Sequence, residues 1–230
     1  MLKHGPRFCR TRSGDIPEHW RIPAPLCQAV WRTHSVLRVD YVQVMEVDRS
    51  ANADALLKHL EAALGSLDES RSVSESFLMA EDGAEFGVVA FGSRRPTTFA
   101  TFGISRHLLS KASDAVSQEL LVGVEDREFA VNLLSTVGRH VLDNHHALDA
   151  GERHRLPGWN EASAIAGVIA VPDPVVAHFG AGPPKIDFLR LLPITDAEAA
   201  YANERGWHEL ADKLAEPGVD LSDLFRGSVV

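Results

Sequence analysis

The stretch from Gly103 to His107 (GISRH) places a serine and a histidine two residues apart, directly after an apolar segment. A hydrolase nucleophile elbow holds its serine in Gly-x-Ser-x-Gly, on a sharp turn between a strand and a helix. Here His107 replaces the second glycine, which gives that turn its room. A serine hydrolase with Ser105 as nucleophile and His107 as base is therefore kept only as the alternative function. The structural interpretation is that Ser105 ends a strand and caps the segment that follows.

Histidines gather in a second stretch, where the sequence contains His140, His145, His146 and His154, with Asp143 and Asp149 among them. A helical zinc site uses two histidines four residues apart and a further ligand. His140 and His145 are five residues apart, and the adjacent His145 and His146 point in different directions. We therefore expect a solvated polar loop and no metal ligand. The alternative is a metal-binding loop in which His145, His146 and an acid converge.

Other patterns typical of cofactor sites are incomplete. Gly180 and Gly182 run into Pro183 and Pro184, and proline lacks the backbone N–H that a phosphate site needs. No Walker-type lysine follows a glycine-rich turn, and no pair of acids is spaced as a general acid and base. The sequence predicts no catalytic residue, no bound cofactor and no enzyme activity.

Hydrophobic spacing predicts the elements that position these residues. Leu56, Leu57, Leu60 and Leu64 indicate a helix over 52–64, capped by Ser50 or Asn52 and ended at Gly65. An apolar stripe predicts a second helix over 126–142. Residues 71–76 and 145–158 are expected to be loops, the latter with a turn at Pro157–Gly158. The expected strands are 85–91, 97–104, 118–124, 163–171 and 186–192.

Two short helices are expected near the end of the chain. Thr195 and Glu198 form the capping box Thr-x-x-Glu before a helix over 196–205, which Gly206 ends. A last helix covers 207–214, and Trp207 is expected to hold it against the sheet. This order of elements predicts an α/β fold, an α+β sandwich with helices packed on a mixed or antiparallel sheet.

Residues 1–44 differ in composition from residues 45–230. They carry a net charge of +4 and four prolines, whereas the remainder carries −13. A segment of this kind buries too little apolar surface to offset its ordering entropy. We expect a basic, Pro-rich, poorly ordered N-terminal extension, with a short strand at most over 36–44, before a domain at 45–230. The extension is either an arm that binds the acidic body or another partner, or it is untranslated because synthesis starts at Met45, which we favour.

The overall composition limits the classes of function. A net charge of −9 argues against nucleic-acid binding, which needs a basic face, and suits a basic protein partner. Cys9 and Cys27 are too few for a disulfide framework or a zinc site. No apolar run is long enough to span a bilayer, and Pro23 and Pro25 interrupt the only candidate signal sequence. These features predict a cytoplasmic protein without membrane contact.

The C-terminal part has the most specific pattern. A strand ending in Leu-Pro-Ile-Thr (192–195) is followed by the helix with Glu198, then Gly206–Trp207, and finally Arg-Gly-Ser-Val (226–229). This arrangement resembles the end of bacterial Suppressor of fused (SUFU) domains. Upstream, Thr-Phe-Gly-Ile-Ser (101–105) resembles the Thr-x-Gly-x-Ser strand end of that family, and Glu-Leu-Leu (119–121) resembles its next strand. The resemblance covers roughly residues 45–230.

This resemblance implies a SUFU-like α/β sandwich of the bacterial single-domain type, with no catalytic centre. The animal member of the family binds a zinc-finger transcription factor, and it has a second domain for which this chain is too short. That partner is therefore not carried over. Bacterial relatives are similar to proposed immunity proteins of polymorphic toxin systems. We expect a protein-binding module that neutralises a basic toxin domain or sequesters a regulated partner. No partner-binding residues and no oligomeric state are assigned.

Overall fold

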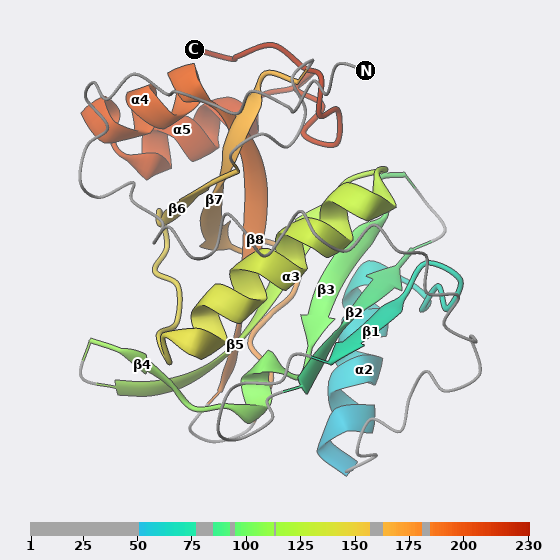
Figure 1. Cartoon of the computed structure of the whole chain (residues 1–230). Helices are drawn as coiled ribbons and strands as arrows, with labels where there is room; N and C mark the ends of the chain where they lie inside the picture. Colours follow the sequence, from blue (N-terminus) through green and yellow to red (C-terminus); the bar gives the residue numbers. More distant parts are fainter. Residues whose placement is uncertain (1–50, 77–84, 93–94, 113, 157–162, 181–184) are drawn as a thin grey trace, which may run out of the picture. The chain divides into compact units, whose positions relative to one another are not determined.

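The computed structural model describes residues 51–76, 85–92, 95–112, 114–156, 163–180 and 185–230. These residues form one mixed sheet, four α-helices and a short 3-10 helix (Figure 1). The helices are α2 (Ala51–Leu64), η2 (Ile104–Arg106), α3 (Arg127–Asp143), α4 (Asp196–Arg205) and α5 (Trp207–Leu214). The strands are β1 (Val73–Ser76), β2 (Glu85–Phe91), β3 (Thr98–Phe102), β4 (Leu109–Lys111), β5 (Asp114–Gly123), β6 (Arg153–Arg155), β7 (Ile165–Pro172) and β8 (Ile186–Thr195).

One parallel pair of strands divides the sheet into two antiparallel halves. The strand order is β1-β2-β3-β5-β8-β7-β6, and β4 pairs with β5 beside this path. β5 and β8 run parallel, with Gln118 opposite Asp187, while the other described pairs are antiparallel. The β5–β8 pair therefore joins strands that are far apart in the sequence, and every other pair joins strands that are close in it.

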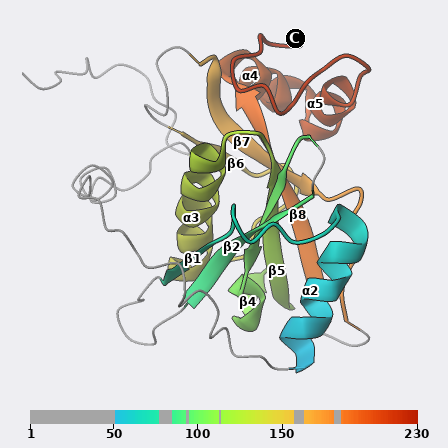
Figure 2. The ribbon, with the colours of Figure 1, turned by 90° about the vertical axis from the view of Figure 1, so that its right-hand side faces the viewer.

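Helices cover both faces of the sheet. Figure 2 shows α3 and α2 on opposite sides of the central strands. On β2, Val88 belongs to the apolar cluster that includes α3, whereas Val89 belongs to the cluster that includes α2. A strand that is buried on both faces needs consecutive apolar residues instead of an alternating pattern. This requirement explains the apolar runs in β2 and β5.

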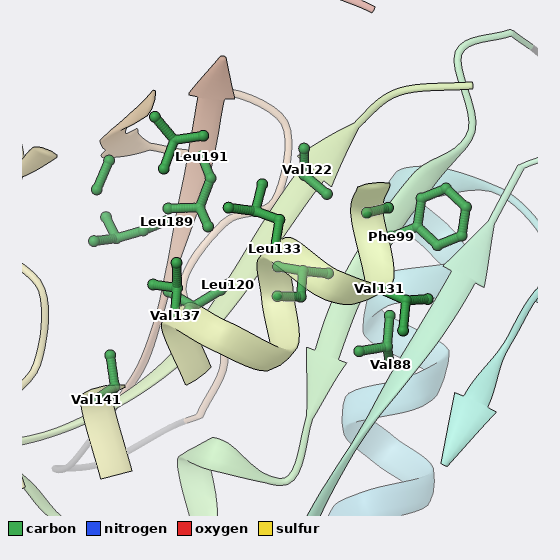
Figure 3. Close-up of a cluster of buried hydrophobic side chains, with 14 of the residues drawn as sticks. Val88, Phe99, Leu120, Val122, Val131, Leu133, Val137, Val141, Leu189 and Leu191 are labelled. Carbon is green, nitrogen blue, oxygen red and sulfur yellow. The ribbon is translucent and has the colours of Figure 1, made fainter. Parts of the chain in front are cut away.

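The larger core lies between α3 and the sheet. Asp126 caps α3, because its carboxylate accepts a hydrogen bond of 2.9 Å from the backbone N–H of Phe129. Figure 3 shows side chains of α3 against those of β5 and β8, and burial of each is worth roughly 1.5–3 kcal/mol. The buried side chains of this core include Leu120, Val122, Leu133, Val137, Val141, Leu189 and Leu191.

Most of the predicted elements are confirmed. The five predicted strands and four predicted helices all form, with ends shifted by a few residues. Gly65 follows α2 with a φ of 99°, as the predicted end of that helix requires. Asn52 lies inside α2, not at its cap, and Ser50 is outside the described residues. Trp207 packs against Gly151, just before β6. A Cβ added to Gly151 would overlap the indole ring.

Two predicted loops contain strands. Residues 73–76 form β1 because they pair with β2, which supplies their backbone hydrogen bonds. This segment is polar, so its hydrophobic pattern does not predict a strand. Residues 153–155 form β6 on β7, and Ala147 and Leu148 in the same predicted loop are buried. The predicted extension 1–44, the start at Met45, the strand over 36–44 and the turn at Pro157–Gly158 lie outside the described residues.

Candidate functional site

The carboxylate of Glu119 is the centre of a buried polar cluster on β5. Its Oε1 accepts hydrogen bonds from the backbone N–H of Gly103 at 2.9 Å and from the hydroxyl of Ser105 at 2.7 Å. The backbone N–H of Ser105 donates to the same oxygen, and the hydroxyl of Thr101 donates to Oε2 at 2.6 Å. The Thr-x-Gly-x-Ser spacing is thus explained, since its three residues converge on one acid. Gly103 has a φ of 125°, which lets the chain turn from β3 into η2.

Burial controls the protonation of this acid. Burial raises the pKa of the Glu119 carboxyl above its ordinary value, and the hydrogen bonds from Thr101, Ser105 and Gly103 oppose that rise. Glu119 was not singled out from the sequence. The available signal was an acid inside the otherwise apolar β5, because a buried acid needs several donors to satisfy it.

The hydroxyl of Ser105 therefore donates to Glu119, and among the described residues it forms no hydrogen bond with His107. Burial, together with the positive charge of Arg106, lowers the pKa of His107. Ser105 is partly buried close to the end of β3, as expected, but the expected capping role is wrong, because Ser105 lies inside η2, whose N-cap is Gly103, and no side chain caps that helix. The geometry gives no support to a dyad of Ser105 and His107.

A second buried carboxylate fastens the C-terminal segment. Glu198, at the start of α4, forms the predicted capping box with Thr195. Its two oxygens also receive a bidentate pair from Arg226, at 2.6 and 2.9 Å. The guanidinium donates further to the backbone oxygen of Pro193 at 2.8 Å. Burial, which by itself raises the pKa of Glu198, is outweighed by Arg226 and by backbone N–H donors, so this pKa is lowered.

The structure divides the four predicted histidines into two groups. His140 and His154 come together, with ring centroids 5.2 Å apart, and Glu152 lies beside them. Nδ1 of His146 instead lies 3.4 Å from the hydroxyl of Ser110, and the backbones of these two residues form an isolated β-bridge. His145 is exposed.

The predicted acids do not join either group of histidines. The carboxylate of Asp149 pairs with Lys111 at 3.6 Å, and Asp143 is exposed at the end of α3. Glu152 was not named among the candidate ligands, because sequence spacing does not reveal that the segment before β6 folds back onto the end of α3.

In the part of the chain that the structure describes, no helix is both long enough and apolar enough to cross a bilayer.

The mixed sheet with helices on both faces places the protein in a fold class that solved structures share. A putative SUFU homolog from Neisseria gonorrhoeae is 19% identical over 78% of this chain and 97% of its own, with a TM-score of 0.59. A chain of the Sufu–Fu complex is 15% identical over 77% of this chain and 92% of its own, with a TM-score of 0.58. Drosophila Suppressor of Fused is 14% identical over 77% of this chain and 51% of its own, with a TM-score of 0.51.

A sequence model of the Suppressor of fused protein matches residues 83–227. The chain therefore belongs to the Suppressor of fused family, a family known for protein interactions, and the predicted resemblance and fold class are confirmed. No curated protein matches the chain.

Proposed function

We propose that this chain is a non-catalytic protein-binding domain. The observation that carries the proposal is its membership of the Suppressor of fused family, in which a similar chain has been crystallised as the Sufu–Fu complex. The contacts of Ser105, the candidate nucleophile, also support the proposal. Ser105 and Glu119 hydrogen-bond to each other, so both are used to hold the end of β3 in place.

Exposed apolar side chains are the first candidates for the binding surface. Leu108 and Phe225 are 63% and 61% exposed, and large apolar side chains supply most of the energy in many interfaces. Addition of a partner strand is less favoured, because the terminal strands of the sheet path, β1 and β6, have only four and three residues. We therefore favour binding through side chains on the surface.

The charge of the chain suits a basic partner. A net charge of −9 accelerates encounter with a positive protein and makes binding sensitive to salt. The partner in this proposal is a basic toxin domain, which the chain neutralises in the cytoplasm as an immunity-type protein. The alternative partner within the same protein-binding function is a regulated protein that the chain holds in an inactive complex. No observation favours the alternative of a serine hydrolase.

The test begins with the full chain as bait in cells of its own host. A captured partner is then purified, and its affinity is measured by calorimetry at two salt concentrations. A genuine basic partner binds with defined stoichiometry and binds more weakly at the higher salt concentration. For the immunity role, a captured basic domain must arrest the growth of cells that make it alone, and co-expression of the chain must restore their growth.

Matched variants locate the surface. Leu108→Asp or Phe225→Asp is expected to weaken binding by about tenfold or more, because each places a charge in an apolar contact. Thr136→Asp, at an exposed position of α3, is the control and leaves the affinity unchanged. The proposal is wrong if no partner binds and the chain instead hydrolyses esters in a way that Ser105→Ala abolishes.

A further inference from the structure

Three potential metal ligands converge from separate segments of the chain. His140 lies in the last turn of α3, Glu152 precedes β6, and His154 is the middle residue of β6. One ring nitrogen of each histidine and one carboxylate oxygen of Glu152 all lie within 4.8 Å of one another. The fold, not the spacing along the sequence, brings these ligands together.

One pair of these atoms already has the separation of zinc ligands. Nε2 of His154 lies 3.3 Å from Oε1 of Glu152. Ligands bound at about 2.0–2.1 Å in a tetrahedral site lie about 3.3 Å apart. The ring of His140 stands edge-on to that of His154, with an interplanar angle of 69°.

The hydrogen bonding of this cluster is incomplete at one atom. Nε2 of His154 is buried and forms no aligned hydrogen bond, although Glu152 is close to it. Buried ring nitrogens normally have a partner, so this atom calls for an explanation. A metal ion between His154 and Glu152 would satisfy it.

The surroundings orient the other ligands. Oε2 of Glu152 accepts a hydrogen bond of 3.0 Å from the backbone N–H of Asp149, which directs Oε1 toward His154. The side-chain amide of Asn144 donates to the backbone oxygen of His140 at 2.7 Å and so holds the last turn of α3. Contacts of this kind hold metal ligands in position in known sites.

We propose that His140, Glu152 and His154 form a Zn²⁺ site with a fourth position open to solvent. Two histidines and a glutamate are an established donor set for zinc. The exposure of His140 leaves the open position accessible to water. The ion ties the end of α3 to β6, and the site differs from the metal-binding loop considered from sequence, in which His145 and His146 were the ligands. It does not depend on the proposed protein-binding function.

A competing arrangement is a simple ion pair between protonated His154 and Glu152. Zn²⁺ titration of the chelator-treated full chain separates the two, with a competing chromogenic chelator to measure the affinity. The expected result is one equivalent bound, with no competition from Mg²⁺, because Mg²⁺ prefers oxygen ligands. Zinc must also raise the melting temperature of the wild type, since it binds only the folded cluster.

Four single variants make the assignment specific. His140→Gln, Glu152→Gln and His154→Gln are each expected to weaken zinc binding more than tenfold. His145→Asn is the matched control, because it removes a neighbouring histidine while asparagine tolerates the φ of 48° at this position. If His154→Gln fails to fold, the exposed His140→Gln decides alone. Absence of binding, or equal binding by His140→Gln and the wild type, overturns the proposal.

Discussion

Replacement of Arg226 by methionine tests how firmly the C-terminal segment is held. Arg226 and Glu198 are 8% and 0% exposed, and four hydrogen bonds link the guanidinium to Glu198, Pro193 and Gly227. Removal of one partner from a buried pair leaves an uncompensated charge and costs about 3–5 kcal/mol. Glu198 keeps donors in the backbone N–H groups of Thr195 and Val229, which places the expected loss near the lower limit.

The expected effect of Arg226→Met is therefore a loss of about 3 kcal/mol in the free energy of unfolding, or roughly 6–12 °C in Tm. Urea unfolding followed by circular dichroism measures it. Arg95→Met is the control: its pair with Glu125 spans 3.8 Å and its side chain is 90% exposed, so the expected cost is about 0–1 kcal/mol.

The pH dependence provides an independent check. Because the folded state lowers the pKa of Glu198, its contribution is present above the ordinary value of 4.5 and is lost as pH falls through the folded pKa. The difference between wild type and Arg226→Met must therefore shrink in acid. Equal losses for Arg226→Met and Arg95→Met at neutral pH would refute the reasoning that this pair fastens the segment.

Two further predictions concern other parts of the fold. Burial raises the pKa of Glu119, so ionisation of this carboxyl destabilises the folded state between pH 4.5 and the folded pKa. Over that range, Glu119→Gln should gain stability relative to wild type as pH rises, by up to about 1.4 kcal/mol per pH unit in urea unfolding. A difference in stability that does not vary with pH would contradict this prediction. Gly151→Ala should lower the Tm more than Gly206→Ala, since both positions have positive φ but only at Gly151 does an added Cβ overlap Trp207. Equal shifts in a thermal melt would show that backbone strain alone matters.

The parts of the fold with strong local signals were predictable. The stripe of α3 and the capping box of Thr195 and Glu198 depend on residues a few positions apart, so the sequence contains their full pattern. The resemblance to the family rested on the C-terminal pattern, and the structure gives that pattern a physical reason, since Arg226 closes on Glu198 across the capping box.

Long-range pairing limited the rest. β1 and β6 are polar and short, and each exists because a neighbouring strand supplies its hydrogen bonds. The same limit applies to the sites. Glu119 meets its donors 14 to 18 residues away, and Glu152 meets His140 only after the chain reverses between α3 and β6. Spacing rules written for a single helix do not detect such clusters.

The parallel pair of β5 and β8 has a consequence for synthesis of the chain. Gln118 of β5 pairs with Asp187 of β8, so β5 has no partner on its β8 side until a further 69 residues have been synthesised. At about 5–20 residues per second, the ribosome adds that length in roughly 3–14 s. During this interval the half-sheet of β1, β2, β3 and β5 presents an unpaired apolar edge, the kind of edge on which nascent chains associate wrongly. The last strand to emerge thus closes the molecule and ends its period of greatest exposure to aggregation.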